Sequence, residues 1–441
     1  MRAGFRIPVL LAAAACGHTA PVPATEAKQQ ASVQSQAQKP QPPPVARTVP
    51  QVDRIFGIEV ADPYRWMEGN ENDEFTAWLR AQGAYARSYL DSLPGRDKLF
   101  GRIRELGLGT AGISDAQTAG GRAFYLLTAP GAQLPALMMH DANGERMLID
   151  PAKLGRENQH ASVNSFAASP DGALVAYDLA LGGGEISSIH VYDVASGREL
   201  PDVIEHVWGE FTASWLPDGK GFFYTQMAPA SAGVDPLLDM KARLHFLGQP
   251  PEKDITVLAR GLSTAMPIAP EEFPVVTATA GSRWLVATAG GARNEIRVAV
   301  APLSSLDRAG TGKTPWQTVT DYSDQVASAA PHGNRLFLES FNEAPNRRLI
   351  SVPFANPRLA NAKVEVPESP EVVLQGIAAA HDGLYVRQMF EGRARLVRLA
   401  WSGEVRPVAL PHEGWIRDFA ADPLRDGAIF DLESWTHPVT C

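Results

Sequence analysis

The sequence predicts an all-β fold, a seven-bladed β-propeller with an incomplete last blade, preceded by a short α-helical segment. A tight turn followed by an apolar strand recurs seven times at intervals of roughly 44 to 64 residues, the range expected of propeller blades. Glycine in each turn supplies the positive φ angle that a hairpin needs, and the aromatic and β-branched run after it reads as a buried strand. The seven copies begin at Gly120, Pro170, Pro217, Gly281, His332, His381 and Arg425.

The second and third copies are the clearest, because each opens with Pro-Asp-Gly, at Pro170 and Pro217. The seventh copy runs from Arg425 to Phe430, close to the end of the sequence at Cys441. We therefore expect the propeller to span residues 106–441 and to be truncated within blade seven.

The N-terminal residues 1–16 have the pattern of an export signal. Arg2 and Arg6 give a basic start, an apolar run follows, and small residues precede Cys16. Residues 17–47 are rich in Pro, Gln and Ala and too poor in large apolar groups to fold, which predicts a disordered tether.

The end of this signal also resembles a bacterial lipoprotein signal, in which the cysteine is lipidated after cleavage. Cys16 would be the lipidated residue, although Ala13 stands where such signals usually have leucine. We expect an exported bacterial protein, either periplasmic or anchored to the membrane as a lipoprotein; simple secretion without a lipid is the alternative. The only other cysteine is Cys441, so no internal disulfide forms if Cys16 is lipidated or removed.

The composition excludes several classes of protein. With 441 residues, 45% of them hydrophobic, the chain can bury a large core. The net charge of -9 and the scarcity of basic clusters argue against a nucleic-acid partner. No stretch reaches the ~18–20 apolar residues that a membrane-spanning helix needs.

Residues 48–105 lack the repeated turn-and-strand pattern of the blades, and their sequence predicts helices. Asn72 or Asp73 can cap a helix that runs to about Leu90, and a second helix is expected over residues 96–106. Aromatic and aliphatic residues repeat at helical spacing along the first helix and make one apolar face. Packing of this face on the folded body is the plainest explanation.

Several segments together resemble the prolyl oligopeptidases. The resemblance is strong over about residues 48–260. Over residues 261–441 it rests on the spacing of the repeated turns and strands. The segments that carry it are Asp62–Glu68, Thr76–Gln82, Phe166–Gly172, Leu200–Ile204, Ser214–Tyr224, His245–Gly248 and Ser434–Pro438.

This resemblance implies a two-domain peptidase. The family joins a seven-bladed propeller to an α/β-hydrolase domain and cleaves short peptides after proline with a Ser/Asp/His triad. Its nucleophile stands in a Gly-x-Ser-x-Gly elbow, and this sequence contains none. We therefore assign no catalytic residue and expect a non-catalytic portion that gates and selects substrates, inactive alone, with the missing hydrolase domain as its partner.

The resemblance also implies which residues face the substrate. In the family the propeller caps the active site, its tunnel excludes large folded substrates, and an acidic residue in a loop of the second blade faces the cavity. Glu185 matches that residue, but Ile186 follows it where the family commonly has tryptophan. An aromatic residue of the third blade lines the proline pocket, and Trp208 or Phe211 matches it, because an extra residue here leaves the alignment open. A solvated loop carboxylate and ordinary core packing are the alternatives for Glu185 and Trp208.

No cofactor or metal site is predicted. The histidines are scattered without an i,i+4 pair or a Cys/His cluster, so each reads as a surface or strand residue. Gly182–Gly184 is expected to connect a hairpin rather than to cradle a phosphate. A second functional hypothesis is an exported propeller that serves as a binding or scaffold module, because propellers support many unrelated functions.

Overall fold

The computed structural model describes residues 42–68, 72–155, 159–229 and 235–441. The predicted signal peptide, most of the tether and the candidate lipidation site Cys16 lie outside the described residues. The chain divides into two compact units, Met1–Gly101 and Arg102–Cys441, and each is described by itself. None of the described helices is both long and apolar enough to cross a membrane.

The first unit contains a hairpin and the helices of the predicted segment. Asn72 caps the first helix, because its side chain accepts the backbone N–H groups of Glu74 and Phe75. Both helices were predicted to within about one residue at their ends. The elements are β1 (Val52–Ile55), β2 (Ile58–Ala61), the 3-10 turn η1 (Arg65–Met67), α1 (Asp73–Asp91) and α2 (Arg96–Gly107), which continues into the second unit.

The β1–β2 hairpin was not predicted from the sequence. Its two central turn residues, Phe56 and Gly57, both have positive φ, at 50° and 81°. Two-residue hairpins with this geometry usually carry Asn-Gly or Asp-Gly. Phenylalanine in the first position gives no such signal, so the sequence does not predict the hairpin.

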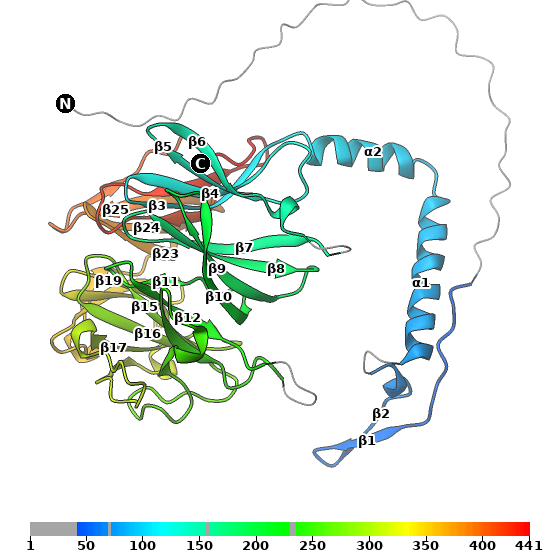
Figure 1. The fold of residues 1–441 in the computed structure, drawn as a ribbon, viewed down its shortest axis with the longest axis horizontal. Helices are drawn as coiled ribbons and strands as arrows, with labels where there is room; N and C mark the ends of the chain where they lie inside the picture. Colours follow the sequence, from blue (N-terminus) through cyan, green and yellow to red (C-terminus); the bar gives the residue numbers. More distant parts are fainter. Residues whose placement is uncertain (1–41, 69–71, 156–158, 230–234) are drawn as a thin grey trace, which may run out of the picture. The chain divides into compact units, whose positions relative to one another are not determined.

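The second unit is built from consecutive antiparallel blades (Figure 1). Its first three blades are β3 (Gly112–Ala119), β4 (Arg122–Thr128), β5 (Ala136–Asp141) and β6 (Gly144–Ile149); β7 (Ala161–Ala168), β8 (Leu174–Leu181), β9 (Ile186–Asp193) and β10 (Arg198–Trp208); and β11 (Ser214–Trp215), β12 (Gly221–Gln226), β13 (Lys241–Phe246) and β14 (Ile255–Leu258). One residue pair, Val207 with Gln226, joins the second and third blades into an eight-stranded sheet.

Three more four-stranded blades follow, and then a sheet of two described strands. They are β15 (Phe273–Ala278), β16 (Trp284–Gly290), β17 (Arg297–Pro302) and β18 (Gln317–Thr320); β19 (Val326–His332), β20 (Arg335–Ser340), β21 (Arg348–Pro353) and β22 (Lys363–Val366); β23 (Val372–Ala380), β24 (Gly383–Phe390), β25 (Arg393–Leu399) and β26 (Val405–Pro407); and β27 (Trp415–Ala420) with β28 (Ile429–Glu433). Short 3-10 turns lie at Pro151–Lys153, Pro251–Lys253, Leu303–Ser305, Tyr322–Asp324 and Leu359–Asn361.

The seven predicted turns each precede the second strand of a blade, which confirms the propeller predicted from the repeat. In the second blade, the Asp171 carboxylate accepts the Ser169 hydroxyl at 2.7 Å and the Ala173 N–H at 3.0 Å. Gly172 follows with φ +66°, and a Cβ there would stand 2.7 Å from the Ala119 carbonyl oxygen of the first blade. Glycine is therefore required both for the turn and for the close approach of two blades.

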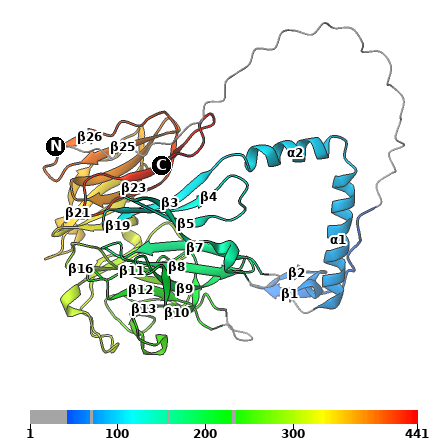
Figure 2. The ribbon, with the colours of Figure 1, turned by 45° about the horizontal axis from the view of Figure 1, so that its top comes forward.

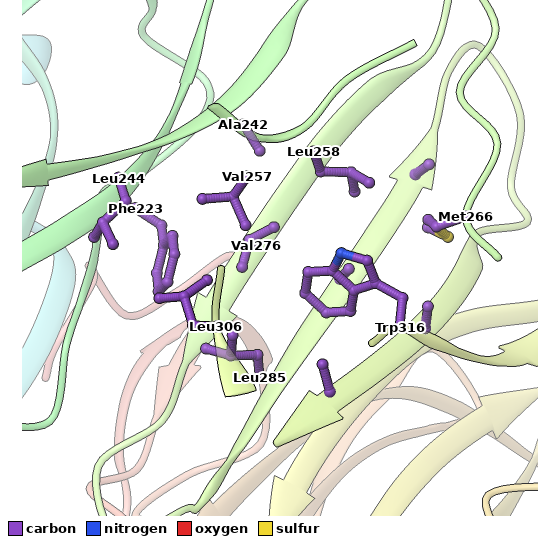
Figure 3. Close-up of a cluster of buried hydrophobic side chains, with 14 of the residues drawn as sticks. Phe223, Ala242, Leu244, Val257, Leu258, Met266, Val276, Leu285, Leu306 and Trp316 are labelled. Atoms are coloured by element: carbon purple, nitrogen blue, oxygen red, sulfur yellow. The ribbon is translucent and has the colours of Figure 1, made fainter. Parts of the chain in front are cut away.

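Apolar side chains fill the space between each blade and the next. The cluster between the third and fourth blades contains Phe223 and Leu258 from one side and Val276, Leu285 and Trp316 from the other (Figure 3). Similar clusters lie between the other consecutive blades. Each sheet therefore buries both of its faces, as stacked propeller blades must.

The ring closes between the seventh and first blades, which lie side by side in both views (Figures 1 and 2). Ile429 of β28 packs against a small cluster that includes Tyr125 and Met138 of the first blade. Arg417 of β27 donates a hydrogen bond at 3.0 Å to the Ile113 carbonyl of β3. After β28, Thr440 pairs with Leu432 in an isolated antiparallel bridge.

Replacing Phe223 with alanine tests the packing between blades. The Phe223 side chain is almost completely buried, so we expect Phe223→Ala to lower the free energy of unfolding by about 3–5 kcal/mol. Trp435→Ala is the control, because Trp435 is fully exposed and its loss should cost less than about 0.5 kcal/mol. Urea unfolding of both variants measures the difference; equal effects would show that this cluster does not hold the blades together.

Candidate functional site

Two predicted residues meet at one end of the propeller. Strands alternate in direction within a blade, so the β8–β9 hairpin and the end of β10 lie where the first strand of each blade begins. We call this the entry end. Glu185 directly precedes β9, and Trp208 is the last residue of β10. The expectation that Trp208 belongs to the third blade was therefore wrong, because β10 is the last strand of the second blade. Gly182 and Gly183 have φ near +70° and form the hairpin, as predicted.

Glu185 and Trp208 line an open hollow of about 520 Å³ between the first two blades. Its other polar side chains come from both blades: Ser114, Asp115, Ser162, Asn164 and Glu210. Three carboxylates line the hollow and no Lys or Arg does. This composition favours a group that carries positive charge or hydrogen-bond donors.

Backbone contacts fix the hairpin that carries Glu185 beside β10. The Glu185 carbonyl accepts the Gly209 N–H at 3.2 Å, and Ile186 pairs with Trp208 in the sheet. The Glu185 side chain is exposed to solvent. Ile186 occupies the position of the expected tryptophan, so an exposed aliphatic side chain stands there instead.

Trp208 and Phe211 belong to one aromatic cluster with Phe273, the first residue of β15. The Trp208 ring lies 5.5 Å from Phe211 and 5.2 Å from Phe273, measured between centroids, and both contacts are edge-to-face. Trp208 lines the hollow, whereas Phe211 packs against Trp208 and Phe273 without being part of its lining. Trp208 is therefore better placed than Phe211 to contact a bound molecule.

Asn164 of β7 contributes to the hollow and was missed by sequence reasoning. A Cβ at position 209 would stand 2.6 Å from the Asn164 side-chain nitrogen, so Gly209 leaves the space that this amide fills. The Asn164 amide oxygen accepts the Ser162 hydroxyl at 3.0 Å. A single asparagine in a strand gives no sequence signal for such a contact.

A buried carboxyl group lies in the same blade and was also missed. Asp178 of β8 is 2% exposed and accepts a 2.6 Å hydrogen bond from the Ser165 hydroxyl. Burial raises the pKa of Asp178 to about 7, although the Ser165 hydrogen bond opposes the shift. The Asp178 carboxyl is therefore half protonated near neutral pH.

Among the described residues, no group of three or more His, Cys, Asp or Glu side chains is arranged to hold a metal ion. The chain also contains no Gly-x-Ser-x-Gly segment that could form a nucleophile elbow. The side chains that line the hollow at the entry end offer carboxylates, an amide and an aromatic ring to a ligand.

Comparison with known proteins agrees with this architecture. The model of the prolyl oligopeptidase N-terminal β-propeller domain matches residues 43–441. The chain belongs to this family.

Two curated relatives are full-length peptidases. The prolyl endopeptidase of Elizabethkingia meningoseptica is 25% identical over 405 residues, which cover 90% of this chain and 54% of the relative. Prolyl oligopeptidase A of Galerina marginata is 24% identical over 368 residues, covering 74% of this chain and 47% of the relative. The chain spans about half the length of the curated relatives that it matches.

Solved structures show the same fold. One from a study of two prolyl endopeptidases superimposes with a TM-score of 0.79 at 27% identity, covering 90% of this chain and 57% of the other. Prolyl oligopeptidase B of Galerina marginata, bound to a 35mer substrate, superimposes with a TM-score of 0.75 over 90% of this chain and 57% of the other. At 20% identity, the second likeness concerns the fold alone.

Asp178→Asn tests the buried carboxyl group. Because the pKa of Asp178 is higher in the folded chain than in the unfolded chain, its ionisation favours unfolding as the pH rises from about 4 to about 7. We expect Asp178→Asn to raise the free energy of unfolding above pH 7, by an amount on the order of 2–4 kcal/mol, and to change it little near pH 4.

Urea unfolding at the two pH values measures the effect. Glu205→Gln is the control, because Glu205 is an exposed carboxylate on the same blade. If Asp178→Asn stabilises the fold equally at both pH values, the raised pKa of the Asp178 carboxyl group is contradicted.

Proposed function

We propose that this chain is the substrate-selecting propeller of a prolyl oligopeptidase-type serine peptidase. It works with an α/β-hydrolase domain that carries the Ser/Asp/His triad, admits short proline-containing peptides and keeps large folded proteins out. The chain has no peptidase activity alone, because no nucleophile elbow is encoded in residues 1–441.

The observation that carries this proposal is the hollow at the entry end. It places Glu185 and Trp208, the residues matched to the substrate-facing positions of the family, on the same lining. The chain enters the first blade at this end, where β3 begins, and β28 ends there too. A hydrolase domain joined to the propeller on either side can therefore stand over the hollow.

The helices of the first unit support the same proposal. Large apolar side chains are at least two-fifths exposed along α1 and α2, among them Leu79, Tyr89, Leu99, Phe100 and Ile103. Exposed apolar surface of this kind marks an interaction site. The hydrolase domain is the partner that covers these side chains.

Glu185 and Trp208 have distinct roles in the proposed selection. The Glu185 carboxylate attracts the positively charged N-terminus of a short peptide, and the Trp208 ring packs against an apolar residue close to the proline. The exposed Glu185 side chain is free to adjust to peptides of different lengths.

The absence of activity in the isolated chain is directly testable. We expect residues 1–441 to leave a Gly-Pro fluorogenic peptide uncleaved at any enzyme concentration used for a full-length prolyl endopeptidase. Turnover that is abolished by a serine-reactive reagent would contradict the proposal and reveal an unrecognised nucleophile.

A chimaera tests selection. Joining this chain to the hydrolase portion of the Elizabethkingia meningoseptica enzyme should give cleavage of short proline-containing peptides. In that chimaera Glu185→Gln should raise KM for a peptide with a free N-terminus about two- to fivefold, the size expected for one exposed charge pair.

The same chimaera supplies its own controls. Glu205→Gln on the neighbouring strand and a peptide with an acetylated N-terminus should both leave KM unchanged. An equal rise in KM for the acetylated peptide would show that Glu185 does not recognise the charge. If the chimaera is active and substitution of Glu185 or Trp208 leaves its KM unchanged, peptides must enter elsewhere on the propeller.

Export and lipidation of the chain belong to the same proposal. The basic start, apolar run and Cys16 support attachment to a bacterial membrane. In a bacterial host fed labelled palmitate, the chain should be labelled, Cys16→Ala should lose the label, and Cys441→Ala should keep it. Retention of the label by Cys16→Ala would contradict lipidation at Cys16.

A further inference from the structure

Three ionisable side chains are buried together where the second blade meets the third. His245 of β13 lies between Asp202 of β10 and Asp254, which precedes β14. The His245 side chain is 0% exposed, and those of Asp202 and Asp254 are 3% and 1% exposed. His245 Nε2 lies 3.0 Å from Asp202 Oδ1, and its Nδ1 lies 2.8 Å from Asp254 Oδ1.

The groups around this trio are all hydrogen-bonded. The Tyr224 hydroxyl donates to Asp254 Oδ2 at 2.8 Å, and the Gly248 N–H donates to Asp202 Oδ1 at 2.6 Å. Arg243 donates to the backbone carbonyl of Asp254 at 2.7 Å. The remaining neighbour is the Phe222 ring, with its centroid 5.4 Å from the imidazole.

This geometry determines where the protons are. A neutral imidazole has one N–H donor and one bare nitrogen, so one of the two ring nitrogens would turn its lone pair toward a carboxylate oxygen. Asp202 Oδ1 already accepts the Gly248 N–H, and Asp254 accepts the Tyr224 hydroxyl, so both side chains act as acceptors. When both carboxyl groups are ionised, only the doubly protonated imidazolium can donate to both of them.

We propose that His245 is an imidazolium, charged at neutral pH, that with Asp202 and Asp254 forms an ionic staple between the second and third blades. The imidazolium lies between the two carboxylates, and the Arg243 guanidinium is held beside Asp254 by its hydrogen bond to the backbone carbonyl of that residue. A buried cluster of this kind tolerates the loss of no single member, because each loss leaves an uncompensated buried charge.

The staple acts on the strand that presents Trp208. Strand β10 pairs irregularly with β9, with register shifts between Glu199 and Val203 and between Ile204 and Val207. Its only residue pair with β12 is Val207 with Gln226. The carbonyls of Glu205 and His206 also accept hydrogen bonds from Gln226 and Met227 of the third blade, all near the end of β10. Asp202 attaches β10 to the third blade at a separate point, farther from the end of the strand, and His245 is therefore a positioning residue for Trp208. The claim that this positioning affects substrate binding rests on the proposed function. The claim that His245 is charged does not.

The pH dependence follows from the same contacts. Burial alone would lower the pKa of His245, but the hydrogen bonds from its ring to Asp254 and Asp202 outweigh burial and raise it. A histidine whose pKa is raised by folding stabilises the fold fully below about pH 6.5, its unfolded value, and loses this contribution as the pH rises through the folded pKa. Alkaline pH therefore weakens the staple.

Nitrogen NMR of the full chain tests the charge directly. In ¹⁵N-histidine-labelled protein at pH about 7.5, where an ordinary histidine is mostly neutral, both ring nitrogens of His245 should carry a proton. His245→Gln identifies the resonance by its loss. A ring that carries one proton at this pH overturns the proposal.

Unfolding equilibria test the staple independently. His245→Gln should reduce the folding equilibrium constant at pH about 6 by about a hundredfold or more, and by less as the pH rises toward about 10. His381→Gln is the matched control, because His381 pairs with Asp426 at 2.7 Å but both side chains are about 70% exposed, so its loss should change the constant less than about fivefold.

Both histidine variants should also be measured in chains that carry Asp178→Asn, because this substitution removes the separate titration of Asp178. Equal effects of His245→Gln and His381→Gln would overturn the staple. If the chimaera does not distinguish a peptide with a free N-terminus from an acetylated one while His245 still carries two ring protons, the proposed function is contradicted and the ionic staple is not.

Discussion

Burial of both faces of every blade is the constraint on which the rest of this structure depends. Each sheet is only a few strands wide, and its stability comes from the apolar clusters that it shares with its two neighbours. A blade cannot be removed or shifted without exposing two such faces to water. The small cluster around Tyr125 and Ile429 and the Arg417 hydrogen bond to Ile113 extend the same arrangement across the ring closure.

The candidate site is a consequence of this stacking. Glu185 and Trp208 lie at the same end of the β9–β10 strand pair, and the first blade supplies Asp115 to the same hollow. The aromatic contact of Trp208 with Phe273 links this site to the fourth blade. The hollow is therefore as rigid as the packing between blades, while its exposed carboxylates stay free to move. Binding specificity can then vary through loop residues without disturbing the core.

The sequence was sufficient for features that depend on local signals. Pro-Asp-Gly turns, the Asn72 cap and the glycine hairpin before Glu185 each fix a local conformation, and all were predicted. The Phe56-Gly57 turn was not, because its first residue is unusual for its geometry. Asn164, Asp178 and the Asp202–His245–Asp254 trio escaped prediction because their properties arise from burial and from partners distant in sequence. Asp202 is 43 residues from His245, and nothing along the chain marks them as neighbours.

The central claim is that the entry end of this propeller recognises short proline-containing peptides. Titration of the ¹⁵N-labelled chain with such a peptide, followed by NMR, tests this claim most directly. The account predicts chemical-shift changes at Glu185, Gly209 and Asn164, and none at the turns of the opposite end, such as Gly172 and Gly219. Changes confined to the opposite end, or no change at any peptide concentration that saturates a full-length relative, would contradict it.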